Sequence, residues 1–158
     1  MFFINSNCHP RTHLSFIESP YARCNDVTND GFSLHNLEDS SVCIKTSTES
    51  VPYDEAKLAC QAYPNGRLFV SDSLEKISLI TESRVYVGLS DAITEDVWVW
   101  ADGRGMTQNQ RTGLFKDGEP NNSNNEDCAL LWNNYDTQLN DDKCSISRQY
   151  VCEIPLGK

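Results

Sequence analysis

The 158-residue chain predicts an α+β fold in which two helices are followed by strands of an antiparallel sheet. Two helical patterns of apolar residues come early. Later segments are short, rich in β-branched and aromatic residues, and separated by polar turns. The length suits one domain and is too short for two. We expect that domain at 39–158, after a polar, loosely ordered N-terminal extension at 1–38.

The first helix is expected to begin at Pro52 and to end before Gly66. Proline suits the first helical position, and the acidic residues Asp54 and Glu55 favour the positive end of the helix dipole. One face of this helix is apolar and consists of Tyr53, Ala56 and Cys60. Cys60 should therefore point into the core.

A second helix should begin near Asp72, because Asp72 and Glu75 have the spacing of a capping box. Its apolar stripe, which we expect in the core, consists of Leu74, Ile77 and Ile80. The strand segments that follow are residues 84–89, 97–100, 129–132, 137–140 and 149–154. Because polar turns separate these segments, we expect them to pair antiparallel.

The formal net charge of −10 argues against nucleic acid and anionic membrane surfaces as partners, because a phosphate-binding protein carries a basic stripe. The same charge is compatible with divalent cations. No apolar run reaches the length of a membrane span, and Met1–Ile4 is too brief for a signal-peptide core. We therefore expect no nucleic-acid partner, no membrane span and no visible targeting signal.

The seven cysteines include no C-x-x-C pair and accompany few histidines, which favours a disulfide framework over a metal cluster. Disulfides persist in oxidising compartments, so we expect a secreted or extracellular protein.

Carboxylates and side-chain amides gather in two short segments of the C-terminal third. The residues concerned are Glu119, Asn121, Glu126, Asn140 and Asp141. Oxygen ligands without His or Cys thiolates suit Ca²⁺, so we expect a calcium site and not a zinc site. Coordination positions left open can accept two vicinal hydroxyls of a sugar. The alternative is that these acidic, asparagine-rich loops are solvated turns.

The stretch 102–128, which contains part of this set, is long, polar and rich in glycine, asparagine and glutamine. A loop of this length in a compact domain is usually functional or disordered. Without metal it has little apolar surface to hold it, so calcium is expected to order it.

Six motifs occur in the order that characterises a known family. They are Tyr86–Leu89, Trp98–Gly103, Gly118–Asn122, Asn125–Cys128, Leu139–Asp141 and Tyr150–Glu153. Together they resemble the C-type lectin domain, over roughly residues 43–154. The resemblance implies a disulfide-bonded C-type lectin-like fold with two helices, antiparallel sheets and a long calcium-binding loop.

The resemblance implies a principal calcium site that also binds the sugar, formed by Glu119, Asn121, Glu126, Asn140 and Asp141. The triplet Glu119-Pro120-Asn121 matches the family's mannose-type pattern, which suits equatorial 3- and 4-hydroxyls, whereas Gln-Pro-Asp accompanies galactose-type ligands. The family has a cis peptide bond before this proline, a form that only about 5–6% of X-Pro bonds adopt in folded proteins.

Residues that match the family's auxiliary calcium site are Asp91, Glu95, Asn122 and Asp127. The spacing around the two ligand segments is similar to that of dendritic-cell receptors for mannose and fucose. In those receptors, positions that match Ser123 and Lys143 also touch the sugar. The alternative is that Asp91 and Glu95 are ordinary turn residues and that Lys143 is solvated.

The disulfides that the resemblance implies are Cys60–Cys152 and Cys128–Cys144, and the expected partner of Cys43 is Cys24. Cys8 is then left over. An odd cysteine in a secreted chain suggests an intermolecular bond, here a homodimer through Cys8, or a reactive thiol. The alternative is that Cys8 lies in an unstructured end of the chain and forms no bond.

Three residues depart from the family pattern, because Tyr86 and Leu139 replace usual tryptophans and Phe115 stands where a tryptophan often precedes the ligand loop. Each keeps an apolar group. Leu139 lies beneath the ligand loop, and its smaller side chain predicts a modest affinity for calcium.

The lead prediction is a calcium-dependent lectin for glycans that carry mannose, fucose or N-acetylglucosamine. The alternative is a lectin-like domain that binds a protein or another surface, such as ice, with calcium only structural. An enzyme is not expected. Glu119 and Glu126 imitate a glycosidase pair, but the ion would occupy both, and no nucleophile with a neighbouring base is visible.

Overall fold

The computed structural model describes residue 24 and residues 30–133 and 136–156. It contains two four-stranded sheets whose neighbouring strands run antiparallel. In spatial order, the first sheet consists of β1 (Ser33–Asn36), β2 (Ser41–Thr46), β8 (Val151–Leu156) and β3 (Arg67–Leu68). The second consists of β5 (Val99–Trp100), β4 (Val85–Ser90), β6 (Cys128–Asn133) and β7 (Thr137–Asp142). The predicted α+β class is confirmed.

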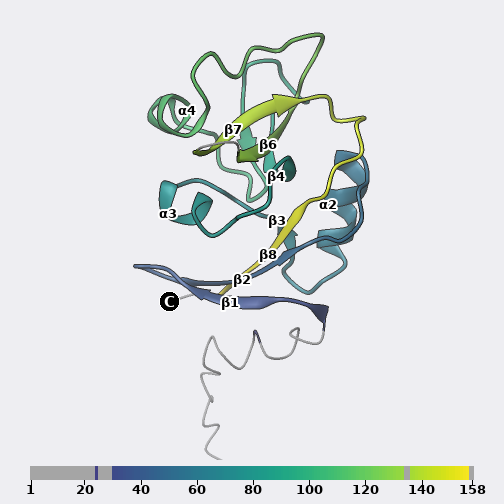
Figure 1. The fold of residues 1–158 in the computed structure, drawn as a ribbon, viewed down its shortest axis with the longest axis vertical. Coiled ribbons are helices and arrows are strands. Elements are labelled where there is room, and N and C mark those ends of the chain that lie inside the picture. Colours follow the sequence, from purple (N-terminus) through teal and green to yellow (C-terminus); the bar gives the residue numbers. More distant parts are fainter. Residues whose placement is uncertain (1–23, 25–29, 134–135, 157–158) are drawn as a thin grey trace, which may run out of the picture.

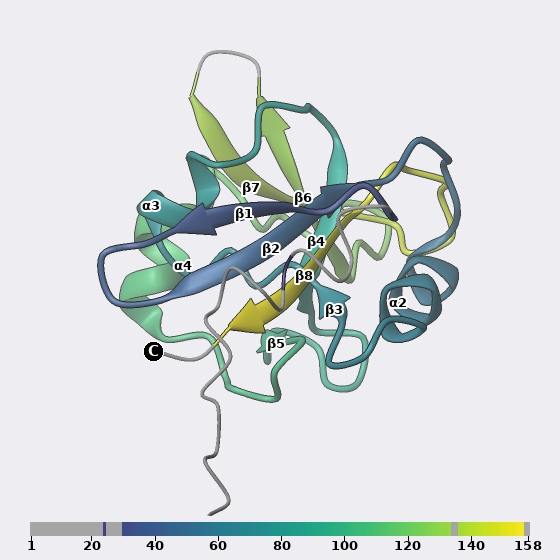
Figure 2. The ribbon, with the colours of Figure 1, turned by 90° about the horizontal axis from the view of Figure 1, so that it is seen from below.

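Helices flank the two sheets on opposite sides. They are α2 (Tyr53–Gln61), α3 (Leu74–Ile77) and α4 (Gln108–Leu114). Helix α2 lies on one side, and α3 and α4 lie on the other (Figures 1 and 2). Within the described residues, no helix has the length and apolar character needed to cross a membrane. The long segment before β6 lies at the end of the molecule opposite β1 (Figure 1).

The prediction for the first helix is confirmed in its extent and in its buried face. Tyr53, Ala56 and Cys60 are the buried residues of α2, and Cys60 is bonded to Cys152 on β8. Pro52 is the N-cap instead of the first helical residue. This disulfide therefore fixes α2 against the first sheet.

The second helix is shorter than predicted, and its N-cap is one residue later than expected. Ser73 is the N-cap, and its side chain accepts a hydrogen bond from the Lys76 amide at 3.2 Å. Asp72 does not cap the helix, because its carboxylate binds Arg104 at 2.6 Å. Leu74 is 65% exposed, so its assignment to the core was wrong, whereas Ile77 and Ile80 are buried.

The expected loose extension at 1–38 includes a strand, so for residues 33–36 that expectation was wrong. Strand β1 pairs with β2 from Ser33 opposite Ile44 to Asn36 opposite Ser41. The Cys24–Cys43 disulfide bonds Cys24 to β2. The Cys60–Cys152 and Cys128–Cys144 pairs also form, so all three expected disulfides are confirmed. Cys8 lies outside the described residues.

The stretch 102–128 is not a continuous loop, because it contains helix α4. Thr107 and Gln110 form a capping box at its N-terminus. Leu114 and Phe115 are buried, and the Phe115 ring packs edge-on against Trp98 at 5.3 Å. The expectation of little apolar anchorage was therefore wrong for the first half of the stretch. Residues 116–127, which carry the candidate ligands, lack helix and strand.

Gly88 generates a prediction about packing between β4 and its neighbours. A Cβ at this position would lie 2.5 Å from the Ala101 Cβ and 2.6 Å from the Leu68 carbonyl oxygen. We expect Gly88→Ala to lower the free energy of unfolding by about 1–3 kcal/mol through overpacking. Urea denaturation followed by tryptophan fluorescence measures the change.

Gly113→Ala in α4 is the matched control, because nothing lies within 4 Å of the added Cβ. It should raise the free energy of unfolding by about 0.5–1 kcal/mol, since alanine is the better helix former. Equal effects of the two substitutions would contradict the packing described for Gly88.

Candidate functional site

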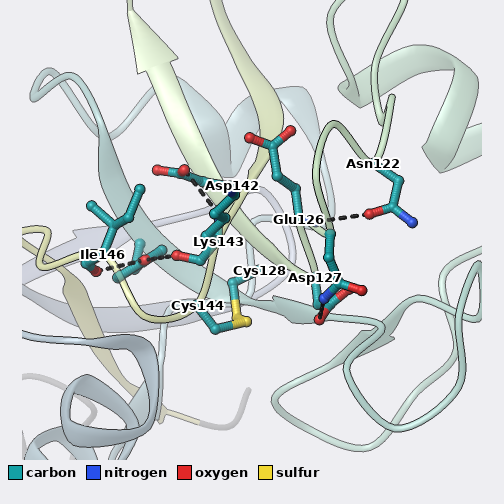
Figure 3. Close-up of a disulfide and its surroundings, with 10 residues drawn as sticks. Asn122, Glu126, Asp127, Cys128, Asp142, Lys143, Cys144 and Ile146 are labelled. Carbon is teal, nitrogen blue, oxygen red and sulfur yellow. Dashed lines mark hydrogen bonds between the residues drawn. A yellow bond between two sulfur atoms is a disulfide. The ribbon is translucent and has the colours of Figure 1, made fainter.

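The antiparallel pairing of β6 with β7 brings the predicted ligand segments together. Ala129 on β6 lies opposite Asp141 on β7, and Cys128 lies opposite Asp142. The Cys128–Cys144 disulfide joins the start of β6 to the turn after β7 (Figure 3). Glu126 and Asp127 immediately precede β6, so this disulfide fastens one ligand segment to the other.

The loop before β6 folds back onto its own side chains. The Ser123 amide donates to Asn121 Oδ1 at 2.8 Å and to Glu126 Oε2 at 3.1 Å. The Glu126 amide donates to Asn122 Oδ1 at 2.7 Å (Figure 3). Backbone N–H groups therefore hold the acidic and amide side chains at one place in the loop.

A further hydrogen bond connects this loop to β7. The Asn122 amide donates to Asp141 Oδ2 at 2.6 Å, across a sequence separation of nineteen residues. The peptide bond between Glu119 and Pro120 is cis, which confirms that expectation. The structure thus brings Glu119, Asn121 and Glu126 close to Asp141 on β7.

The carboxylates of this cluster carry unpaired oxygens. Glu119 Oε2 and Asp141 Oδ1 are buried and have no hydrogen-bond partner in the described part of the chain. Burial, reinforced by Asp141, raises the pKa of both Glu119 and Glu126 above the ordinary carboxyl value. Buried unpaired carboxylate oxygens that repel each other are suited to a hard cation.

No three His, Cys, Asp or Glu side chains already surround a single point among the described residues. A complete oxygen shell therefore needs the amides of Asn121 and Asn140 as well as the carboxylates. The Asn140 side-chain N–H donates to the Asp141 carbonyl oxygen, which leaves its amide oxygen as an acceptor. The donor set of carboxylates and amides fits Ca²⁺.

Asp91, which is predicted for an auxiliary calcium site, lies near two of its predicted partners, Glu95 and Asp127. The Asp91 amide donates to the Asp127 carbonyl oxygen at 3.1 Å. Asp91 is buried, and its Oδ1 has no hydrogen-bond partner in the described residues. Burial, followed by the charges of Glu95 and Asp127, raises the pKa of Asp91. Asn122 lies on the adjacent loop and is engaged by Glu126.

Lys143 and Ser123, the predicted additional sugar contacts, border the principal cluster. Lys143 is half-buried after β7, and its charge lowers the pKa of Glu126 against the larger effect of burial. The Lys143 amide donates to Asp142 Oδ1 at 2.9 Å. Ser123 is exposed and contributes its backbone N–H to the loop.

Sequence reasoning missed how the turn after β7 is fixed. The Tyr86 hydroxyl bridges the Lys143 and Ile146 carbonyl oxygens, with 2.8 Å to each. Asp142 pairs with Arg148 at 2.8 Å. Tyr86 is fully buried on β4, and a buried tyrosine needs a hydrogen-bond partner. Its replacement of the usual tryptophan was a signal of this role.

Comparisons with known proteins place the chain in a family. The family model for the lectin C-type domain matches residues 49–154. Hepatic lectin from Gallus gallus is 36% identical over 121 residues, which are 73% of this chain and 56% of that protein. Lectin BRA-3 from Megabalanus rosa is 31% identical over 122 residues, which are 72% of each chain.

A solved structure shows the same fold. The carbohydrate-recognition domain of the mouse scavenger receptor C-type lectin superposes with a TM-score of 0.64 at 27% identity. The match covers 79% of this chain and 95% of that domain. The chain described here is therefore a member of the C-type lectin domain family.

Proposed function

We propose that this protein is a secreted, calcium-dependent lectin for glycans with mannose, fucose or N-acetylglucosamine termini. The observation that carries the proposal is the cluster at the β6–β7 end, where Glu119 and Asp141 have buried, unpaired carboxylate oxygens. The similarity to hepatic lectin and BRA-3 supports carbohydrate recognition. The Glu119-Pro120-Asn121 triplet supports the mannose-type choice.

The proposed site consists of Glu119, Asn121, Glu126, Asn140 and Asp141, with an auxiliary ion at Asp91, Glu95, Asn122 and Asp127. Calcium would supply open coordination positions for two vicinal hydroxyls. The carboxylate of Glu119 accepts a hydrogen bond from a sugar hydroxyl, and the Asn121 amide N–H donates to a hydroxyl oxygen. Ser123 and Lys143 make further contacts at the edge.

Recognition without catalysis follows from this assignment, because the carboxylates are occupied in binding the ion. One sugar makes a small and wet contact, so monosaccharide affinity is weak and useful binding needs several sites. A homodimer through Cys8, which lies outside the described residues, would supply a second site. The three disulfides support an extracellular location.

The proposal is tested by retention on mannose-agarose in millimolar calcium, followed by a chelator wash. A multivalent preparation of the folded protein should bind, should be released by the chelator, and should pass through galactose-agarose. Failure of the folded, multivalent protein to bind any mannose-, fucose- or N-acetylglucosamine-bearing resin would favour the alternative, in which the domain binds a protein or a surface such as ice.

A double substitution tests which residues determine the specificity for mannose over galactose. Glu119→Gln with Asn121→Asp creates the galactose-type triplet and exchanges the positions of the hydrogen-bond donor and acceptor. We expect affinity for mannose to fall at least about tenfold, the effect of roughly one misplaced hydrogen bond, and retention on galactose-agarose to appear.

Asn124→Asp is the matched control, because it alters an exposed residue of the same loop outside the proposed ligand set. It should leave the preference for mannose unchanged. The assignment of Glu119 and Asn121 is wrong if the double variant still prefers mannose while retaining calcium, as measured by calorimetry.

The raised pKa values of Glu119 and Glu126 predict opposite effects of acid on the metal-free and metal-bound forms. Between the ordinary carboxyl pKa and the raised one, the folded metal-free protein binds more protons than the unfolded chain. Its stability therefore rises as pH falls through this range, and the gain is complete below the ordinary pKa. Calcium needs both carboxylates ionised, so calcium affinity falls over the same range.

Retention on mannose-agarose should thus be lost on moving from neutral to mildly acidic pH. Over the same interval, these two groups should raise the Tm of the chelator-treated protein relative to a Glu119→Gln/Glu126→Gln variant. If the Tm of both proteins in chelator changes with pH by the same amount, neither carboxyl has a raised pKa.

A further inference from the structure

A cavity of about 190 Å³ lies between α2 and the β4–β5 hairpin, apart from the proposed sugar site. Its lining is mainly apolar and includes Leu68, Ile93, Val97, Val99 and Trp100. An apolar cavity of about 150 Å³ is large enough to bind benzene, so this space accepts a short alkyl chain or a single ring. It is too small for a larger, drug-sized ligand.

Two features of the rim distinguish this cavity from an ordinary packing gap. Ile93 is 95% exposed and Val97 is 53% exposed, so apolar side chains stand in water beside the opening. An exposed apolar residue is normal by itself, but a pair next to an apolar cavity marks a binding surface. A ligand that covered both side chains would gain the free energy of removing them from water.

The polar part of the lining is cationic. Lys57 on α2 is exposed and forms no ion pair with the described residues. Arg67 on β3 donates its Nε–H to Glu153 at 2.7 Å, and its guanidinium carries further N–H donors. An unpaired lysine at an apolar opening favours a ligand with an anionic group, which can accept a charge-assisted hydrogen bond.

Two carboxylates near this end of the cavity are already paired. Asp102, which lies between the lining residues Ala101 and Gly103, accepts from Arg104 at 2.7 Å. Glu153 is fully buried and binds both Arg67 and Lys76. Neither of these two carboxylates is therefore free to pair with Lys57.

We propose that this cavity binds a small amphiphilic carboxylate, with its alkyl chain or ring against Ile93, Val97 and Val99 and its carboxylate at Lys57 and Arg67. The assignment does not depend on the proposed sugar site. The carboxylate accepts charge-assisted hydrogen bonds, and the apolar part fills the cavity. A peptide with an acidic and an apolar side chain is a different partner, which the test below separates.

Titration of the ¹⁵N-labelled full-length protein with octanoate, followed by amide shifts in NMR spectra, tests the proposal. We expect saturable shifts at Ile93, Val97, Ala101 and Gly103, with a Kd on the order of 1 mM for so small a ligand. Octanol and octylammonium should bind at least about fivefold more weakly, because they lack the anionic group. A soluble peptide that carries Glu and Leu should cause no saturable shifts at these positions.

Two exposed positions give variants that should fold. Lys57→Glu should weaken octanoate at least about tenfold and strengthen octylammonium, and Ile93→Asp should weaken both. The matched controls are Lys116→Glu and Leu74→Asp, which change an exposed lysine and a 65% exposed leucine outside the cavity. They should bind octanoate as the unsubstituted protein does.

Amide spectra of the free variants confirm that each one is folded. The proposal is overturned if octanoate causes no saturable shifts at the cavity, if octanol binds equally well, or if Lys57→Glu binds octanoate unchanged. Shifts confined to residues 119–127 would overturn it too, because they would place the carboxylate at the sugar site.

Discussion

Repulsion between the carboxylates of Glu119, Glu126 and Asp141 is the constraint on which the β6–β7 end of the structure depends. Burial and mutual proximity raise the pKa values of Glu119 and Glu126, which means that the fold opposes their ionisation. The chain holds them together nonetheless through the Cys128–Cys144 disulfide and through amides of the same loop. A bound divalent cation would reverse the sign of this energy, which supports the proposed ion site.

Contacts with β4 and β7 hold the turn and the strand next to the carboxylate cluster in place. The Tyr86 hydroxyl anchors the turn after β7, and fully buried Leu139 lies on β7 beside the cluster. Phe115 forms a backbone bridge to Leu139 and packs edge-on against Trp98, which connects α4 to the same sheet. Because these contacts are apolar or involve backbone carbonyls, they persist whatever the charge state of the ligand loop. The contacts beneath the ligand loop therefore do not depend on the ionisation of its carboxylates.

Sequence patterns predicted the elements that their own residues identify without reference to distant parts of the chain. The helix at 53–61 has a distinct apolar face, β4 and β8 contain β-branched or aromatic residues, and β6 begins with an apolar run. Strands β1, β2 and β3 were missed. Strands β1 and β3 have only four and two residues, and β2 and β3 pair with β8, which is distant in the sequence. Helix α4 was missed because its residues are polar and its stability comes from a capping box and from burial of Leu114.

The candidate ligands were predictable because a calcium site needs particular residue types, and six ordered motifs placed them in one family. Which oxygens remain unpaired was not predictable, since that depends on backbone N–H groups that only the folded loop positions. Asp91 illustrates the difference. Its Oδ2 accepts the Asp96 amide at 2.9 Å, while its Oδ1 is left buried and unpaired. Sequence identified the residue, and folding determined which of its atoms is available.

The segment 91–97 serves both candidate binding regions, and this has a thermodynamic consequence. Asp91 faces the Asp127 backbone near the proposed auxiliary ion, whereas Ile93 and Val97 border the apolar cavity. A ligand at either place acts on the conformation of the same seven residues. If one ligand stabilises the conformation that the other requires, the second binds more tightly by the same factor that it confers on the first. Any coupling between the proposed ion and the proposed amphiphile is therefore reciprocal.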